Sequence, residues 1–149
     1  MKGALAAVLL GLCLTFLPHL SQAQNWAGES IIDPLTSVPG DATKGRAIVA
    51  SRQTGLCLLC HSGPFPEERF QGNLAPDLSA SVSHSTAAQL RARLVDPSRF
   101  NPTTIMPAYY RTTGLNRVAP KFVNQTILSG QEIEDVVAFL VSLQTQSLQ

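Results

Sequence analysis

The sequence predicts a small all-α domain, and the strongest indication is an apolar stripe near the C-terminus. Its residues fall at i, i+3, i+4, i+7 and i+8, the spacing of one helix face: Ile133, Val136, Val137, Leu140 and Val141. Just before it, Ser129 and Glu132 stand three positions apart, as in the capping box that begins a helix. No segment alternates apolar and polar residues as a half-buried strand does, and the sequence has no internal repeat.

Two shorter helices are expected before this one. Asp41 or Thr43 is a suitable N-cap for a helix that runs to about Ser51. Ser85 is a suitable N-cap for a second helix, which Pro97 ends because proline cannot continue the hydrogen-bond ladder.

The remaining segments are rich in proline and glycine, which indicates irregular structure. We expect an extended arm at 24–40, a loop at 63–81 and an extended or turn-rich segment at 101–110. The arm carries four large apolar side chains, which we predict to lie on the surface of a partner: Trp26, Ile31, Ile32 and Leu35.

The first 23 residues have the pattern of an export signal. Lys2 is positive, 4–17 is almost entirely apolar, and small residues precede a cleavage site after Ala23. The apolar run is shorter than the roughly 20 residues that span a bilayer, so we expect no membrane anchor in the mature chain. The predicted division is a signal peptide at 1–23, an arm at 24–40 and one domain at 41–149.

Charge argues against nucleic acid as a partner. The chain has 11 basic and 10 acidic residues, and removal of Lys2 with the signal leaves ten of each. Phosphate binding needs a basic excess, which this composition lacks. The stretch 91–121 is locally basic, with only Asp96 as an acid, and is either a solvated face or a docking face for an acidic partner or an anionic substrate.

Few soft ligands remain once the signal is removed: Cys57, Cys60, His61, His84 and Met106. Three of them form the motif C-L-L-C-H at 57–61, for which four interpretations exist. A structural zinc site needs a second ligand pair, and a redox dithiol needs alternating strands and helices, neither of which the sequence offers. A disulfide across so short a loop constrains little and leaves His61 unexplained.

The fourth interpretation is covalent attachment of haem c, and the motif favours it. Two thiols so spaced add to the two vinyl groups of the porphyrin, and the histidine that follows binds the iron. Export agrees with it, because haem c is joined to proteins outside the cytoplasm. We therefore predict one covalent haem c, held by Cys57 and Cys60 with His61 as the proximal ligand.

The second axial ligand is expected to be Met106. It is the only methionine after residue 23, and Pro102 and Pro107 limit the conformations of its segment. The alternative role for Met106 is to fill a gap in the core, as methionines commonly do. His84 is the rival ligand, but its polar surroundings favour exposure to solvent.

Several segments resemble SoxX, the family of monohaem cytochrome subunits of sulfur-oxidising SoxAX complexes. The resemblance spans about residues 40–143 and includes N-P-T-T-I-M-P at 101–107. Its other segments are 40–49, 57–61, 72–78, 95–100, 114–118 and 131–140. It implies a class I cytochrome c-like fold with His61 and Met106 as axial ligands. Pro76 matches the position whose carbonyl contacts the proximal histidine, although Ala75 stands where glycine is common.

The resemblance also implies a periplasmic location and a heterodimer with SoxA. In that complex thiosulfate is oxidatively joined to a cysteine of the carrier SoxYZ, and two electrons are released. SoxA holds the catalytic haem of this L-cysteine S-thiosulfotransferase, and SoxX passes the electrons to a downstream acceptor. Two other functions remain open: a free periplasmic electron shuttle, and a ligand-sensing cytochrome with one open iron position.

Overall fold

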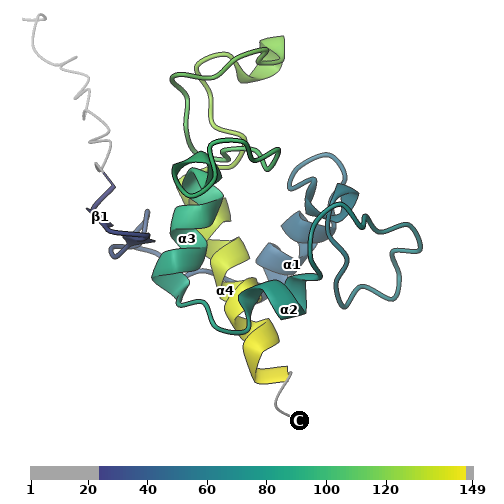
Figure 1. The fold of residues 1–149 in the computed structure, drawn as a ribbon. Helices are drawn as coiled ribbons and strands as arrows, with labels where there is room; N and C mark the ends of the chain where they lie inside the picture. The colour runs from purple at the N-terminus through teal and green to yellow at the C-terminus, as the bar shows by residue number, and fades with distance from the viewer. Residues whose placement is uncertain (1–23, 147–149) are drawn as a thin grey trace, which may run out of the picture.

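The computed structural model describes residues 24–146, so the predicted signal peptide lies outside the described residues. Within that range the chain forms four α-helices, three short 3-10 helices and one small hairpin (Figure 1). The helices are α1 (Ala42–Ala50), α2 (Leu78–Val82), α3 (Ala87–Val95) and α4 (Gly130–Gln146). The all-α prediction is thus confirmed. None of these helices is long and apolar enough to cross a membrane.

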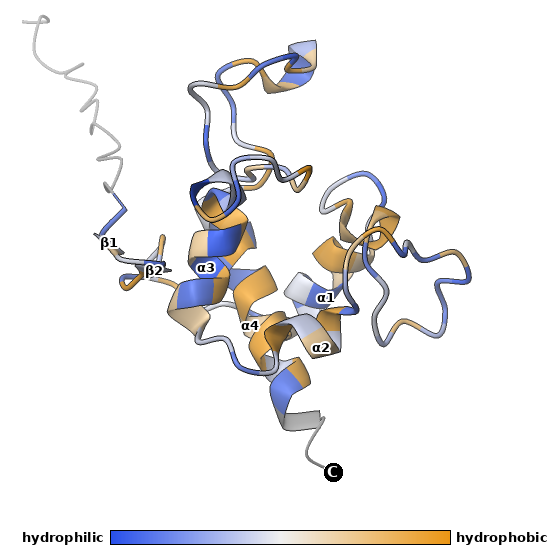
Figure 2. Cartoon of the chain, viewed as in Figure 1, coloured by the Kyte–Doolittle hydropathy of each residue, from blue (hydrophilic) through white to orange (hydrophobic). Residues whose placement is uncertain are grey.

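Helix α4 forms the centre of the domain, and α1, α2 and α3 all pack against it. Figure 2 shows apolar residues along its length. The predicted capping box is confirmed, because Ser129 N–H donates to the Glu132 carboxylate and Glu132 N–H donates to the Ser129 hydroxyl. The predicted stripe is buried: Ile133, Val136, Val137 and Leu140 are all core residues, and Val141 packs against them.

Helix α1 crosses α4 at very short range. Gly45 makes this possible, because a Cβ at this position would overlap the Asp135 carbonyl of α4. Asp41 caps the helix by accepting from the N–H groups of Thr43 and Lys44, at 2.8 and 3.2 Å. Its own N–H donates to the Asp135 carboxylate at 2.8 Å, which joins the start of α1 to α4.

Two predictions about the middle of the chain were wrong. The N-cap of α3 is Thr86 rather than Ser85, because the Thr86 hydroxyl accepts from Gln89 N–H while the Gln89 side chain accepts from Thr86 N–H. Helix α2 begins within the predicted loop 63–81 and ends one residue beyond it. It is only five residues long, with Asp77 as its cap, so it has too few positions to show a periodic pattern.

The arm 24–40 packs on its own domain. Strands β1 (Trp26–Ala27) and β2 (Ser30–Ile31) pair in a hairpin, and Gly28 has the positive φ of +58° that such a turn favours. Ile31 is fully buried with Ala92 and Val95 of α3, and Trp26 and Leu35 pack around them. Of the four apolar side chains predicted to lie on a partner, only Ile32 is exposed. That prediction was therefore wrong for Ile31, which is fully buried, whereas Trp26 and Leu35 are half-buried against its cluster.

A buried ion pair fixes the arm in this position. Arg91 of α3 donates to both carboxylate oxygens of Glu134 of α4, at 2.7 and 2.8 Å, and also to the carbonyl of Ile31 at 2.8 Å. Glu134 also accepts from the N–H of Leu35 at 2.9 Å. Every charged atom is thus paired inside the protein, as buried ions require.

Several cations of the basic stretch 91–121 make contacts within the domain, and Arg91 is excluded from any docking face because it is buried. Arg91 is buried in the pair with Glu134, and Arg111 donates to Asp96 at 3.1 Å. Arg93 and Arg99 lie over aromatic rings of Phe100 and Trp26. These contacts use the cations to join elements of the domain itself.

Candidate haem site

The motif 57–61 folds into one tight turn after α1. Cys57–Leu59 form a 3-10 helix, entered through Leu56 in the left-handed conformation with φ of 60°. The carbonyl of Cys57 accepts from the N–H groups of both Cys60 and His61, at 3.1 and 2.9 Å. Neither cysteine is in a disulfide. The turn therefore presents two free thiols and an imidazole from five consecutive residues.

The segment 72–78 runs beside this turn and is joined to it by three backbone hydrogen bonds. Its N–H groups at Gly72, Ala75 and Leu78 donate to carbonyls of the turn and its flank, at 2.9, 3.0 and 2.8 Å. The acceptors are the carbonyls of Leu58, Cys60 and Ser62. A Cβ on Gly72 would overlap the backbone of Leu59 and Cys60, so only glycine permits this approach.

This pairing brings the Pro76 carbonyl to the His61 ring. Nδ1 of His61 lies 2.7 Å from that oxygen. Because a carbonyl only accepts, Nδ1 is the nitrogen that donates, which in the neutral ring leaves the lone pair on Nε2. The contact is the one that the resemblance to SoxX implies, and Ala75 in place of glycine does not prevent it.

The first thiol of the motif lies in a largely apolar environment. Cys57 Sγ is 3.4 Å from the Gly55 carbonyl and 4.0 Å from the Tyr109 hydroxyl. Burial raises the pKa of Cys57 to about 11, and the contact with Tyr109 offsets only part of that effect. Burial likewise raises the pKa of Tyr109, with a further contribution from Cys57, so its hydroxyl stays neutral at physiological pH.

Met106 and His84 lie near opposite ends of α4. Met106 is half-buried against the core, and Tyr109, three residues later, accepts backbone hydrogen bonds from Ile127 and Leu128 just before α4 begins. His84 is exposed in the turn between α2 and α3. The carbonyls on either side of that turn accept from Gln144, near the end of α4. The predicted exposure of His84 is confirmed.

The residues at the motif fit a covalent haem. Both thiols are free, and the His61 ring is oriented through Nδ1, as metal-binding imidazoles usually are. Large apolar side chains next to these segments lie open to solvent: Leu59 is 47%, Leu74 73% and Ile105 77% exposed. A large apolar ligand would cover such side chains. Within residues 24–146 no three His, Cys, Asp or Glu side chains are grouped to hold a metal ion by themselves.

Sequence reasoning missed two aromatic residues around the motif. Phe65 lies in a segment to which the sequence assigned no role, yet it is buried against Phe139 with ring centroids 5.7 Å apart. Tyr109 is 3% exposed and contacts the loop of Cys57. The only signal in the sequence was that Tyr109 stands three residues after the candidate ligand Met106. That proximity does not reveal its contact with Gly55, 54 positions away.

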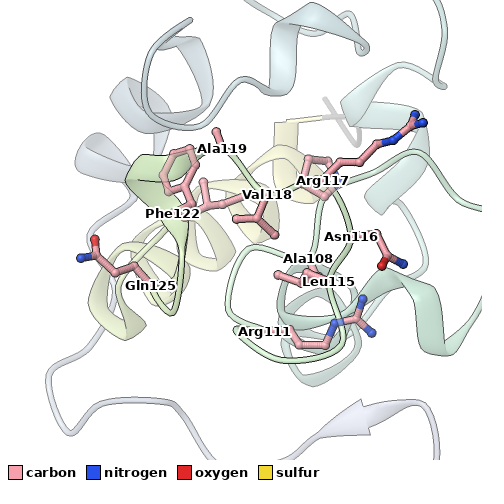
Figure 3. A pocket seen from close by; sticks show the side chains of 11 residues that line it. Ala108, Arg111, Leu115, Asn116, Arg117, Val118, Ala119, Phe122 and Gln125 are labelled. Carbon is pink, nitrogen blue, oxygen red and sulfur yellow. The ribbon is translucent and has the colours of Figure 1, made fainter.

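A pocket of about 250 Å³ lies in the lobe formed by residues 107–127. Figure 3 shows Phe122, Val118 and Leu115 around it, while the Arg117 guanidinium points outward. Nε of Arg111, at its edge, is buried without a hydrogen-bond partner. No sequence pattern predicted this pocket.

A comparison with solved structures identifies the family. No family model and no curated protein sequence matches the chain. The crystal structure of SoxXA from P. pantotrophus contains a chain that is 32% identical, with a TM-score of 0.73. The alignment covers 81% of this chain and 94% of that chain. This chain therefore belongs to the SoxX family of electron-transfer cytochromes.

Proposed function

We propose that this chain carries one covalent haem c and is the electron-accepting subunit of a periplasmic SoxAX complex. Cys57 and Cys60 form the two thioether bonds, and His61 and Met106 are the axial ligands. The observation that carries the proposal is the 2.7 Å contact between His61 Nδ1 and the Pro76 carbonyl, beside two unpaired thiols. Haem supplies a one-electron redox centre whose potential depends on its axial ligands.

Pro76 acts as the orienting group of the proximal side. Its carbonyl holds the proton on Nδ1 and fixes the plane of the ring, so that Nε2 of His61 faces the iron. The hydrogen bond also increases the basicity of the ring and strengthens its bond to a metal. Pro76 itself is held in place by the backbone bonds that Ala75 and Leu78 donate to the carbonyls of Cys60 and Ser62.

Met106 supplies the distal ligand from a segment of restricted conformation. Its N–H donates to the Thr104 hydroxyl at 3.1 Å, and Pro107 fixes the backbone that follows. A neutral thioether favours the ferrous state and so raises the reduction potential, which suits an acceptor of electrons. His84 lies at the other end of α4, so it is not the distal ligand in this proposal.

Two filled axial positions determine the role of the subunit. A haem held by both His61 and Met106 would offer a sulfur compound no open position, so bond formation between thiosulfate and the SoxYZ cysteine would take place on SoxA. This chain accepts the released electrons and passes them to a downstream acceptor. The signal peptide predicted at residues 1–23, with cleavage after Ala23, would export this chain to the periplasm.

The test is reconstitution with SoxA. The mature holoprotein and SoxA are mixed at micromolar concentrations and examined for a one-to-one complex by sedimentation. Thiosulfate and SoxYZ are then added while the absorption of this haem is followed. We expect reduction of the haem only when SoxA and SoxYZ are both present, and no thiosulfate chemistry by the isolated chain.

Reconstitution and a separate measurement of carbon monoxide binding distinguish the alternatives. A chain that stays monomeric beside SoxA supports the free-shuttle function and contradicts the proposal. Turnover of thiosulfate by the isolated chain also contradicts it. Rapid binding of carbon monoxide to the reduced form shows an open iron position and supports a ligand-sensing cytochrome instead.

A further inference from the structure

Tyr109 joins the two segments that carry the proposed haem ligands. Its hydroxyl donates to the Gly55 carbonyl at 2.6 Å and lies 4.0 Å from Cys57 Sγ. It stands three residues after Met106, and three residues span at most about 10 Å. A buried side chain close to Met106 in sequence is thus bonded to the loop that precedes the motif.

The backbone of Tyr109 is fixed as firmly as its side chain. Its N–H donates to the carbonyl of Leu94 in α3 at 3.0 Å. Its carbonyl accepts from the N–H groups of Ile127 and Leu128, at 2.9 and 3.1 Å, just before α4. The residue is therefore held between two helices of the domain, and its hydroxyl extends this rigid frame to the loop of Cys57.

No second side-chain connection of this kind exists in the described part of the chain. Between residues 51–77 and residues 101–127, the Tyr109 hydroxyl makes the only side-chain hydrogen bonds, and no ion pair joins the two segments. The next tyrosine, Tyr110, packs against both apolar clusters, and within the described residues its hydroxyl makes no hydrogen bond to residues 51–77.

We infer that Tyr109 is a positioning residue that ties the Met106 segment to the haem-attachment loop and so keeps Met106 bound opposite His61. This inference rests on the ligand pair of the proposed function. Without the hydroxyl, the buried Gly55 carbonyl loses its donor and the loop of Cys57 is no longer fixed relative to Met106. Dissociation of the thioether then becomes easier, although neither ligand has been changed.

The test uses the Tyr109→Phe variant of the full-length chain, exported and with haem attached. The ring remains, so the buried contacts of the core are kept. Three readouts are taken: the charge-transfer absorption of the ferric methionine-ligated haem during denaturation, the rate at which the reduced form binds carbon monoxide, and the reduction potential. The rate reports how often Met106 leaves the iron.

We expect the carbon monoxide rate to rise about tenfold, the factor that corresponds to loss of one donor to a buried carbonyl. The charge-transfer absorption should be lost at a lower denaturant concentration than in the unaltered protein. The reduction potential should fall, because weaker thioether ligation favours the ferric state. The matched control is Tyr110→Phe, which makes the same chemical change one residue away and should leave all three quantities unchanged.

Two failures are distinguishable. If the unaltered holoprotein shows no charge-transfer absorption that depends on Met106, the ligand pair of the proposed function is wrong. If that absorption is present but Tyr109→Phe binds carbon monoxide no faster than Tyr110→Phe, the inference about Tyr109 is overturned. Lower stability toward urea with an unchanged rate also overturns it, because that pattern belongs to a purely structural residue.

Discussion

The α1–α4 pair and the two ligand-bearing loops, 51–77 and 101–127, are held together by different means. The helix pair is stabilised by apolar burial, with Val49 of α1 and Val136 of α4 both 1% exposed and Gly45 allowing the close crossing. Loop 51–77 is held in shape by backbone hydrogen bonds between 72–78 and 58–62, and the hydroxyl of Tyr109 joins loop 101–127 to it.

The difference lies in what each region leaves uncovered. The helix pair buries its apolar faces within the chain, whereas the loops expose Leu59, Leu74 and Ile105. Under the proposed function, covalent haem supplies the apolar core that the loops lack. Changes in the helix pair should therefore affect the stability of the domain, whereas changes in the loops should affect retention and ligation of the haem.

The largest effect is expected from removal of both thiols. One haem should remain bound to the unaltered protein after acid and organic extraction. The Cys57→Ala, Cys60→Ala double variant should hold no covalent haem and should fail to fold, because a chain of this size gains much of its core from the cofactor. Circular dichroism measures folding, and the pyridine haemochrome spectrum after extraction measures covalent haem. A well-folded, haem-free double variant would show that the loops need no haem.

The next effect concerns the ion pair between α3 and α4. Arg91→Met leaves the Glu134 carboxylate buried without its partner, which typically costs 3 to 5 kcal/mol, so we expect a loss of about 4 kcal/mol in the free energy of unfolding. Urea unfolding of the holoprotein measures it. The Arg91→Met, Glu134→Leu double variant should recover part of the lost unfolding free energy, because no buried charge then remains without a partner. A loss below about 1 kcal/mol in the single variant would contradict the buried pairing.

A smaller effect is expected where α1 crosses α4. Gly45→Ala improves helix propensity, yet its methyl group meets the Asp135 carbonyl and the Cβ of Phe139. Overpacking of this kind costs about 1 to 3 kcal/mol, so the variant should be less stable in urea. Lys44→Ala, on the exposed side of the same helix, should change stability by no more than about 0.5 kcal/mol. A Gly45→Ala variant of equal or greater stability would contradict the close crossing of α1 and α4 at this position.

The smallest effect belongs to the ion pair of Arg46 with Glu67. The hydrogen bond from Arg46 lowers the pKa of Glu67 below its ordinary value. A lowered folded-state pKa means that the stabilisation is present above the unfolded pKa and is lost as pH falls through the folded one. The stability difference between the unaltered protein and Glu67→Gln should therefore be small at pH 7 and vanish in acid. A difference that grows on acidification would contradict this direction.

The sequence was sufficient for those elements that local chemistry determines. The cap at Asp41, the capping box of α4 and the motif at 57–61 each depend on side chains within a few residues of one another. The same holds for the exposure of His84, which follows from its polar neighbours. Prediction of the haem ligands also began from a local motif, although the choice of Met106 depended on the removal of Met1 with the predicted signal peptide.

The remaining features depend on tertiary contacts that no local pattern shows. The arm was predicted to lie on a partner, but Ile31 packs on α3 because Arg91, 60 positions away, bonds its carbonyl. Thr86 replaces Ser85 as the cap because only its hydroxyl meets Gln89 N–H. Tyr109 reaches a carbonyl 54 positions away, a distance in sequence at which periodicity carries no information.

The central claim is that Met106 and His61 together hold one haem between the two loops. Its most direct test is the charge-transfer absorption of the ferric holoprotein, compared among the unaltered chain, Met106→Ala and His84→Ala. The account predicts that the absorption is present in the unaltered protein, lost in Met106→Ala and kept in His84→Ala. Loss in His84→Ala with retention in Met106→Ala would contradict it and move the distal ligand to the other end of α4.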